Sequence, residues 1–168
     1  MFGNSTSSFV EKFLTTAFNA YAHTDCDGKV EVKVVDDAYG KPTSVWLIAQ
    51  KIKAIIENNL HGEFNCNDSI GQISRYGWAN MIWEEFLDEH RQCSIDDSEL
   101  LSSLRDNISI VPVASSSLAL PLKHPGQVDS FILESKDYSE YRKDTKKYID
   151  RNWHRLLDLA KSIIESKD

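Results

Sequence analysis

The C-terminal end of the chain carries the apolar pattern that most constrains its fold. Five apolar side chains recur there at alternating steps of four and three residues: Ile149, Trp153, Leu156, Ala160 and Ile163. Side chains at this spacing lie on one side of an α-helix, and such a stripe is buried when the helix packs lengthwise on another helix. The sequence therefore predicts one long helix over residues 137–166. The part before Tyr148 is less apolar and richer in lysine and arginine, so we expect it to project beyond the core.

Helix and strand patterns both precede this C-terminal helix. Helical spacing covers residues 8–22, 44–61, 69–76, 78–91 and 94–104, and strand-like runs cover residues 29–34, 108–113, 118–120 and 128–133. The second helix is apolar around most of its girth, so we expect it to be the most buried helix, with Ile52 and Ile56 in the core. We expect Gly62 to end this helix and Gly77 to close the short one after it. Ser8 and Glu11 have the spacing of a capping box.

These patterns predict an α+β fold, a helix-dominated single domain with a small sheet and a long C-terminal amphipathic helix. The sheet is drawn from residues 29–35 and 108–134. We divide the chain into an α+β core domain, residues 1–136, and the C-terminal helix, residues 137–168, packed on the core or projecting from it. With 168 residues, a chain buries about 70% of its unfolded surface on folding, which is enough for a core without metal or disulfide.

Three features bear on the compartment. No run of eighteen apolar residues occurs, so no membrane span is predicted. The first residues lack the basic and apolar regions of a secretory signal, so we expect a cytoplasmic protein. Cys26, Cys66 and Cys93 have no C-x-x-C spacing. Reduced thiols are therefore expected, and neither disulfides nor a zinc site.

The residues just before the C-terminal helix carry the pattern nearest to catalytic chemistry. Glu134 and Lys136 stand at the end of a predicted strand, and Asp129 precedes them by five residues or more. This E-x-K arrangement resembles the core of metal-dependent PD-(D/E)xK nucleases. The resemblance implies that the two carboxylates would hold Mg²⁺ and that the lysine would stabilise the attacking water or the developing charge. The alternative is ordinary charge at a strand edge, because Glu31 and Lys33 repeat the same spacing.

Other sequence motifs for catalysis or cofactor binding are missing. The five histidines are scattered, and Arg151 and His154 are interpreted as solvated helix surface. The sequence has no zinc-protease motif, phosphate-binding glycine loop, dinucleotide fingerprint or nucleophile elbow. We therefore expect no cofactor and no enzyme activity, with Mg²⁺ kept for the nuclease alternative.

The negative charge of the chain is concentrated in one stretch. The formal net charge is −7, which argues against direct binding of nucleic acid. Residues 84–99 contain seven acidic side chains and one basic one, Arg91. The acidic residues expected to meet a partner are Glu84, Glu85, Asp88, Glu89, Asp96 and Asp97. We interpret the stretch either as a solvated helical face or as a docking surface for a basic protein.

A second candidate contact surface is the outer face of the C-terminal helix around Tyr138, Tyr141, Trp153 and Leu157. Aromatic side chains supply most binding energy at interfaces, whereas charges orient the partners. The sequence therefore favours a non-catalytic protein-interaction protein, either a small acidic accessory subunit or a neutralising partner in an intracellular assembly, for example an immunity or defence component. No membrane contact is expected. The nuclease alternative, binding of a small molecule and an unfamiliar enzyme site stay open.

Overall fold

The computed structural model of the chain describes residues 8–24, 29–64, 72–88, 94–118 and 139–166. In these ranges the elements follow the order α1 (Phe9–Ala22), β1 (Val30–Val35), β2 (Tyr39–Gly40), α2 (Val45–Glu57), β3 (Ile73–Ser74), α3 (Arg75–Phe86), α4 (Ile95–Asn107), β4 (Ile108–Val113), a 3₁₀ turn (Ser115–Ser117) and α5 (Ser139–Glu165). The predicted helix-dominated α+β fold is confirmed. The third predicted strand, most of the short run at 118–120, and all three cysteines lie outside the described residues.

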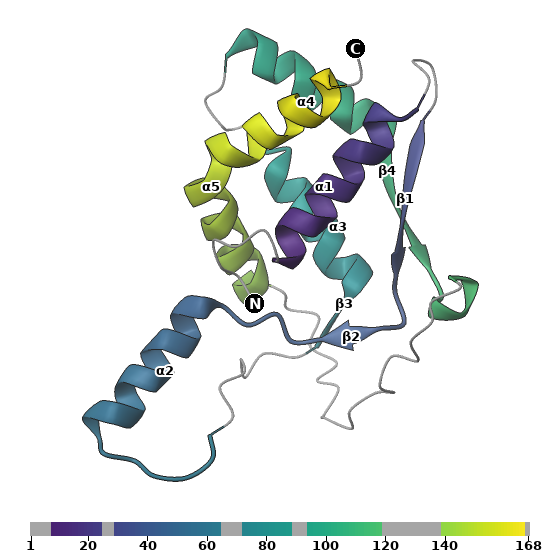
Figure 1. Cartoon of the computed structure of the whole chain (residues 1–168). Helices are drawn as coiled ribbons and strands as arrows, with labels where there is room; N and C mark the ends of the chain where they lie inside the picture. Colours follow the sequence, from purple (N-terminus) through teal and green to yellow (C-terminus); the bar gives the residue numbers. More distant parts are fainter. Residues whose placement is uncertain (1–7, 25–28, 65–71, 89–93, 119–138, 167–168) are drawn as a thin grey trace.

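The described core has three layers (Figure 1). Helix α5 packs on α1 and α3, and these two helices cover one face of the β1–β4 pair. Side chains with no more than 2% exposure come from all three helices and include Val10, Leu14, Phe18, Ile82, Phe86, Tyr141, Ile149 and Leu156. Large apolar side chains buried this completely contribute about 1.5–3 kcal/mol each, so this contact between helices is the main source of stability.

Helix α1 begins as its sequence predicts, with one difference. The hydroxyl oxygen of Ser8 accepts a hydrogen bond from the backbone N–H of Glu11 at 3.3 Å, which satisfies one amide of the first helical turn. The carboxylate of Glu11 lies instead with Tyr148 and Arg155 on α5. A residue expected to cap its own helix thus joins two helices.

The small sheet consists of two separate pairs among the described strands. Strand β1 runs parallel to β4, with Val30 opposite Ile108 and Val35 opposite Val113. Lys29, Glu31 and Lys33 are exposed while Val30 and Val32 are buried, which confirms the alternation predicted for this strand. Strands β2 and β3 form the second, antiparallel pair.

The start of α3 differs from the prediction. Residues 75 and 76 begin α3 instead of ending a separate short helix, and Gly77 lies in its first turn. The hydroxyl oxygen of Ser74 accepts a hydrogen bond from the N–H of Gly77 at 2.9 Å, so this serine is the cap. A Cβ atom at Gly77 would lie 3.2 Å from Cγ1 of Ile73, so the glycine allows close packing at this point.

Helix α5 confirms the predicted apolar stripe. Ile149, Leu156 and Ala160 are fully buried, and the ring of Trp153 lies 5.2 Å from that of Phe86 on α3. The expectation that the first half of this helix projects beyond the core is wrong. Its residues Tyr141, Thr145 and Tyr148 are at most 8% exposed, because the same stripe continues toward the helix start at steps of four and three.

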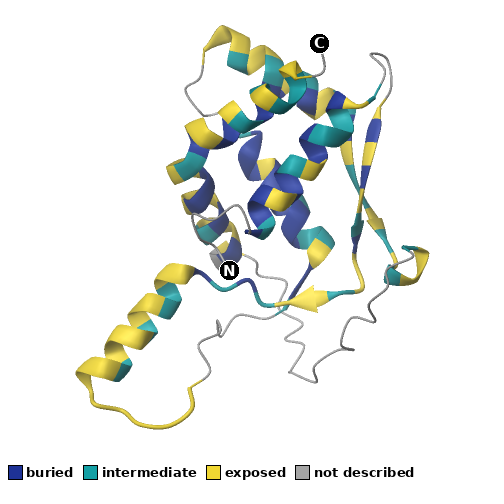
Figure 2. Cartoon of the chain, viewed as in Figure 1, coloured by how far each residue is buried: buried dark blue, intermediate teal, exposed yellow. Residues whose placement is uncertain are grey.

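The prediction that α2 is the most buried helix is wrong. None of its residues is buried, and the helix points away from the three-layer core (Figure 1). Ile52 is 48% exposed and Ile56 is 72% exposed, which Figure 2 shows as a mostly exposed helix. The pattern of the sequence correctly indicated an amphipathic helix, but none of the described elements covers its apolar side.

The end of α2 has a complete cap made by local residues. Asn59 takes the left-handed conformation at φ 49°, the N–H of Leu60 donates to the carbonyl of Ile55 at 3.0 Å, and that of Asn59 donates to the carbonyl of Ile56 at 3.1 Å. This pair of bonds is the Schellman motif. The helix therefore ends at Glu57, before the predicted Gly62. Among the described helices, none combines the length and apolarity that crossing a membrane requires.

Candidate functional site

The acidic stretch is paired with the chain's own C-terminal helix. Arg142 on α5 donates hydrogen bonds to Glu84 at 2.5 Å and to Glu85 at 3.0 Å. Lys146 lies 3.6 Å from Glu85 and 2.8 Å from Asp88. Glu85 is only 6% exposed, so its charge is compensated within the fold. The basic counterpart of these acidic residues is α5 itself.

The same pairing shifts the pKa values of the groups involved. The hydrogen bond to Asp88 is the main reason that the pKa of Lys146 lies above its usual value. At the other end of α5, Lys161 pairs with Asp97, and this contact, with the Ser94 hydroxyl, lowers the pKa of the Asp97 carboxyl. Of the other expected acidic residues, Asp96 is exposed on α4 and Glu89 lies outside the described residues.

The prediction of an aromatic contact surface on the outer face of α5 is wrong for Tyr141, Trp153 and Leu157. Tyr141 is 2% exposed, Trp153 is 7% exposed and Leu157 is 4% exposed. Their side chains face α1 and α3, because they continue the same apolar stripe that buries α5. Tyr138 lies outside the described residues.

The nuclease alternative depends on residues in the segment just before α5. Asp129, Glu134 and Lys136 lie outside the described residues, whereas Glu31 and Lys33, which repeat the spacing, are exposed on β1. Within the described ranges, no three histidine, cysteine or acidic side chains gather into a group that could hold a metal ion.

A buried polar cluster joins α1 to α5. The hydroxyl of Tyr148 donates to Oε1 of Glu11 at 2.8 Å, and Nη2 of Arg155 donates to the same oxygen. Burial is the main cause that raises the pKa of Tyr148. Because both donors are used by one carboxylate between packed helices, the cluster is suited to hold the helices together. No pattern in the sequence indicated this cluster, apart from the presence of Glu11 in the predicted capping box.

The described residues leave one coherent apolar surface exposed, and it lies on α2. Its stripe recurs at helical spacing and is formed by Val45, Ile48, Ile52, Ile55 and Ile56. Leu60 and Phe64 follow in the segment after the helix, at 48% and 46% exposure. We call these seven residues the α2 surface. Single exposed apolar side chains are ordinary, whereas a stripe along a whole helix is a larger apolar patch than most protein surfaces leave open to water.

The base of α2 is held against α5 by Trp46. The guanidinium of Arg151 lies 4.7 Å from the centre of the Trp46 ring, and the ammonium of Lys147 lies 5.9 Å from it. Cations at these distances are attracted to the face of the ring, by about 0.5–1 kcal/mol at an exposed site. Trp46 itself is 58% exposed, so part of it extends the apolar area at the start of α2.

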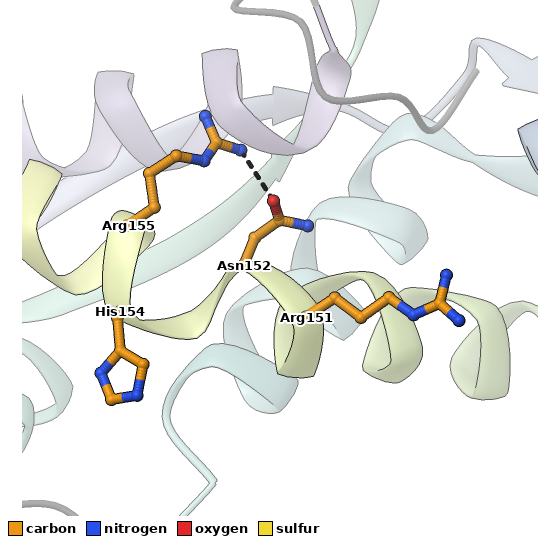
Figure 3. Close-up of a pocket in the computed structure, with 4 residues that line it drawn as sticks. All are labelled: Arg151, Asn152, His154 and Arg155. Atoms are coloured by element: carbon orange, nitrogen blue, oxygen red, sulfur yellow. Dashed lines mark hydrogen bonds between the residues drawn. The ribbon is translucent and has the colours of Figure 1, made fainter.

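A shallow hollow lies beside this contact on α5 (Figure 3). It has a volume of about 420 Å³ and is lined by Arg151, Asn152, His154 and Arg155. Figure 3 shows Asn152 and Arg155 pointing toward one another, joined by a hydrogen bond of 3.2 Å, while Arg151 and His154 point away from them. Arg155 is also paired with Glu11, and the Arg151 guanidinium lies over the Trp46 ring, so both arginines of the lining already have partners within the chain.

Comparison with known proteins adds information on the fold. The sequence matches no protein-family model, and no curated protein is significantly similar to it. The structure is similar to that of a dTDP-4-dehydrorhamnose reductase from Clostridium acetobutylicum, with a TM-score of 0.59 and 21% sequence identity. The similarity covers 90% of this chain and 45% of the reductase chain, so the chain spans less than half of that protein. At this identity the likeness concerns the fold.

Proposed function

We propose that the chain is a non-catalytic protein-interaction protein that binds another protein through the α2 surface. The observation that carries this proposal is the exposure of Ile52 and Ile56 on a well-formed helix. Full burial of each side chain by a partner would contribute about 1.5–3 kcal/mol. A small accessory subunit of a cytoplasmic assembly, expected from the sequence, remains part of the proposal.

The shortness of α2 supports the need for a partner. Helices of fewer than about 12–15 residues are marginal in water on their own, and most helices in proteins are stabilised by packing of an apolar face. Helix α2 has 13 residues, a complete C-terminal cap and an ion pair between Lys53 and Glu57, yet no buried side chain. Covering its apolar stripe would supply the missing packing.

In this proposal the main contact surface is the α2 surface and not the acidic stretch of residues 84–99. Glu84, Glu85 and Asp88 already have basic partners on α5. A basic protein that approached α4 would meet Asp96 and Glu99, which are exposed. These two residues would adjust the rate of association, whereas the α2 surface would supply the affinity.

The test compares two variants that both remove exposed isoleucine. The tagged chain is used to isolate binding proteins from its native cells, and each candidate is then purified and its affinity measured. Ile52→Asp/Ile56→Asp should weaken binding at least about a hundredfold. Ile95→Asp is the control, because Ile95 is 79% exposed but lies on α4. Equal affinity of both variants and the original chain for every candidate would refute the proposal.

A second candidate function is favoured by the structural similarity to the reductase. In this candidate the chain forms part of a protein that acts on a thymidine-diphosphate sugar, and the α2 surface is covered by the counterpart of the reductase region that this chain does not match. Calorimetric titration with dTDP and with a dTDP-sugar tests it, with UDP as the control nucleotide. Absence of binding, both for the chain alone and together with its α2 partner, would contradict this candidate.

A further inference from the structure

We infer that the hollow on α5 and the neighbouring Trp46 ring form a binding site for a mononucleotide, in which Arg151 holds a phosphate group and Trp46 stacks on the base. This site is separate from the α2 surface and goes beyond the proposed function. The inference follows from the cations of α5 that lack a carboxylate partner, from the exposed ring beside them, and from the size and lining of the hollow.

The basic side chains of α5 fall into two sets. One set pairs with carboxylates that lie mainly on α1, α3 and α4, and consists of Arg142, Lys146, Arg155 and Lys161. Within the described residues, the other set has no ion pair and consists of Lys143, Lys147 and Arg151. These three recur at steps of four residues, so they form a row along the exposed face of the helix. The described part of the fold leaves their charge uncompensated.

Arg151 keeps its charge and its hydrogen-bond donors although it contacts Trp46. The indole ring is neutral, and the guanidinium lies over its face at 4.7 Å from the ring centre. Within the described residues, no N–H group of Arg151 donates a hydrogen bond. A guanidinium carries its donors in one plane, as a fork that matches two oxygens of a phosphate. Because the ring already restricts the side chain, less entropy is lost when a phosphate binds.

The hollow beside Arg151 offers further donors and no negative charge. Its volume of about 420 Å³ lies within the range of small-molecule sites. The four lining residues include no carboxylate, and the carboxylate nearest to them, on Glu11, is already bound by Arg155 (Figure 3). His154 is exposed and forms no hydrogen bond within the described residues, so its imidazole is available to a second phosphate oxygen.

The Trp46 ring supplies the contact for a base. It is 58% exposed although Arg151 and Lys147 lie over it, so part of its surface is open to a further contact. Nucleobases stack on exposed aromatic side chains, and each such contact strengthens binding roughly 5- to 150-fold. Because Arg151 touches both the ring and the hollow, one small molecule can reach all three.

A small ligand suits this site better than a large anion. Salt limits charge interactions to about 8 Å at physiological ionic strength, so a mononucleotide is affected mainly by the row of α5. From Lys143 to Arg151 the row is about 12 Å long. A nucleic acid, an acidic protein or an anionic membrane would extend beyond it and meet the remainder of a chain whose net charge is −7. Electrostatic repulsion would then oppose binding.

The test is calorimetric titration of the full chain with ADP, in a buffer of low salt that contains a chelator. Adenosine and pyrophosphate are the two fragments of this probe. Arg151→Gln removes the phosphate contact, and its matched control is Arg75→Gln, because Arg75 is also exposed. Trp46→Leu removes the ring, and its control is Tyr39→Leu, because both aromatic residues are 58% exposed. Thermal unfolding of each variant checks that it is folded.

We expect a Kd below about 1 mM for ADP and binding at least about fivefold weaker for each fragment. The affinity for ADP should fall at least about tenfold in Arg151→Gln and at least about fivefold in Trp46→Leu. Each control should change it less than about twofold. Stacking accepts any base, so dTDP and UDP should bind much as ADP does, which sets this site apart from the second candidate function.

Four results would overturn the inference. The first is the absence of binding at millimolar ADP, and the second is an equal loss in the variants and in their controls. The third is pyrophosphate that binds as tightly as ADP, which would leave an anion site without a base contact. The fourth is a short oligo(dA) that binds at least about a hundredfold more tightly than ADP and depends on Arg151, which would make nucleic acid the ligand.

Discussion

The hydroxyl of Tyr148 on α5 donates a hydrogen bond of 2.8 Å to the carboxylate of Glu11 on α1, inside a contact between two helices. The carboxylate is on a residue only 4% exposed, and it also accepts a hydrogen bond from Arg155. Burying a charge is costly unless the charge is paired and hydrogen-bonded. This cluster therefore makes the position of α5 on α1 depend on three particular side chains.

The first prediction concerns the loss of this carboxylate. Glu11→Ala removes the partner of a buried hydroxyl and of Arg155, and we expect it to lower the free energy of unfolding by about 2–3 kcal/mol. Tyr148→Phe keeps the ring and should cost about 1 kcal/mol. Urea denaturation of both variants and of the double variant gives their coupling energy. A coupling energy of zero would show that the hydrogen bond does not contribute to stability.

Stability should fall at alkaline pH. Burial raises the pKa of Tyr148 above 10.0, and the hydrogen bond to Asp88 raises the pKa of Lys146 above 10.5. A raised pKa means that the folded state binds the proton more tightly, so the stabilisation is complete below the unfolded pKa and is lost as pH rises through the folded one. Urea midpoints measured from pH 8 to 11.5 should decline above about pH 10. The decline should be smaller in Tyr148→Phe, and an equal decline would contradict the assignment.

Because the acidic stretch is paired with basic side chains of α5, we predict that charge reversal affects stability differently at Glu84 and at Glu85. The Glu85 side chain is 8% exposed and lies near both Arg142 and Lys146, so Glu85→Lys should destabilise the fold by more than about 2 kcal/mol. The Glu84 side chain is 48% exposed, and Glu84→Lys should cost less than about 1 kcal/mol. Thermal unfolding followed by circular dichroism compares the two. Adding Arg142→Glu/Lys146→Glu should recover part of the loss at Glu85.

The local elements of the fold could be predicted from sequence because their causes are local. The stripe of α5, the alternation of β1 and the Ser8 cap depend on residues within a few positions of one another. The acidic stretch could be seen as a charge, but its partners are 57 and 58 residues away in the chain. Linear spacing carries no information about such a pairing, so a solvated helical face and a docking surface for a basic protein are the two interpretations that the sequence supports.

The prediction for α2 was limited in the same way, because the sequence pattern of a helix does not identify what covers its apolar side. The periodicity of α2 correctly indicated a helix with one apolar side, and Ile52 and Ile56 were correctly placed on that side. Periodicity states that a face will be covered, but it does not state whether the cover comes from the same chain. The assignment of α2 to the core was wrong because the apolar faces of α1, α3 and α5 already satisfy one another.

The last prediction separates the α2 surface from the core by its effect on stability. Truncation of a buried leucine removes its transfer free energy and leaves a cavity, so Leu156→Ala should lower the free energy of unfolding by about 2–5 kcal/mol. Ile52→Ala and Ile56→Ala remove side chains that are 48% and 72% exposed. Each should therefore cost less than about 1 kcal/mol in the isolated chain, mostly through the change in surface exposure. Guanidinium denaturation measures all three variants, and the slope with denaturant should stay unchanged if only stability differs. A loss of about 2 kcal/mol or more at Ile56 would mean that α2 is packed within the isolated chain. The α2 surface would then not be available to a partner.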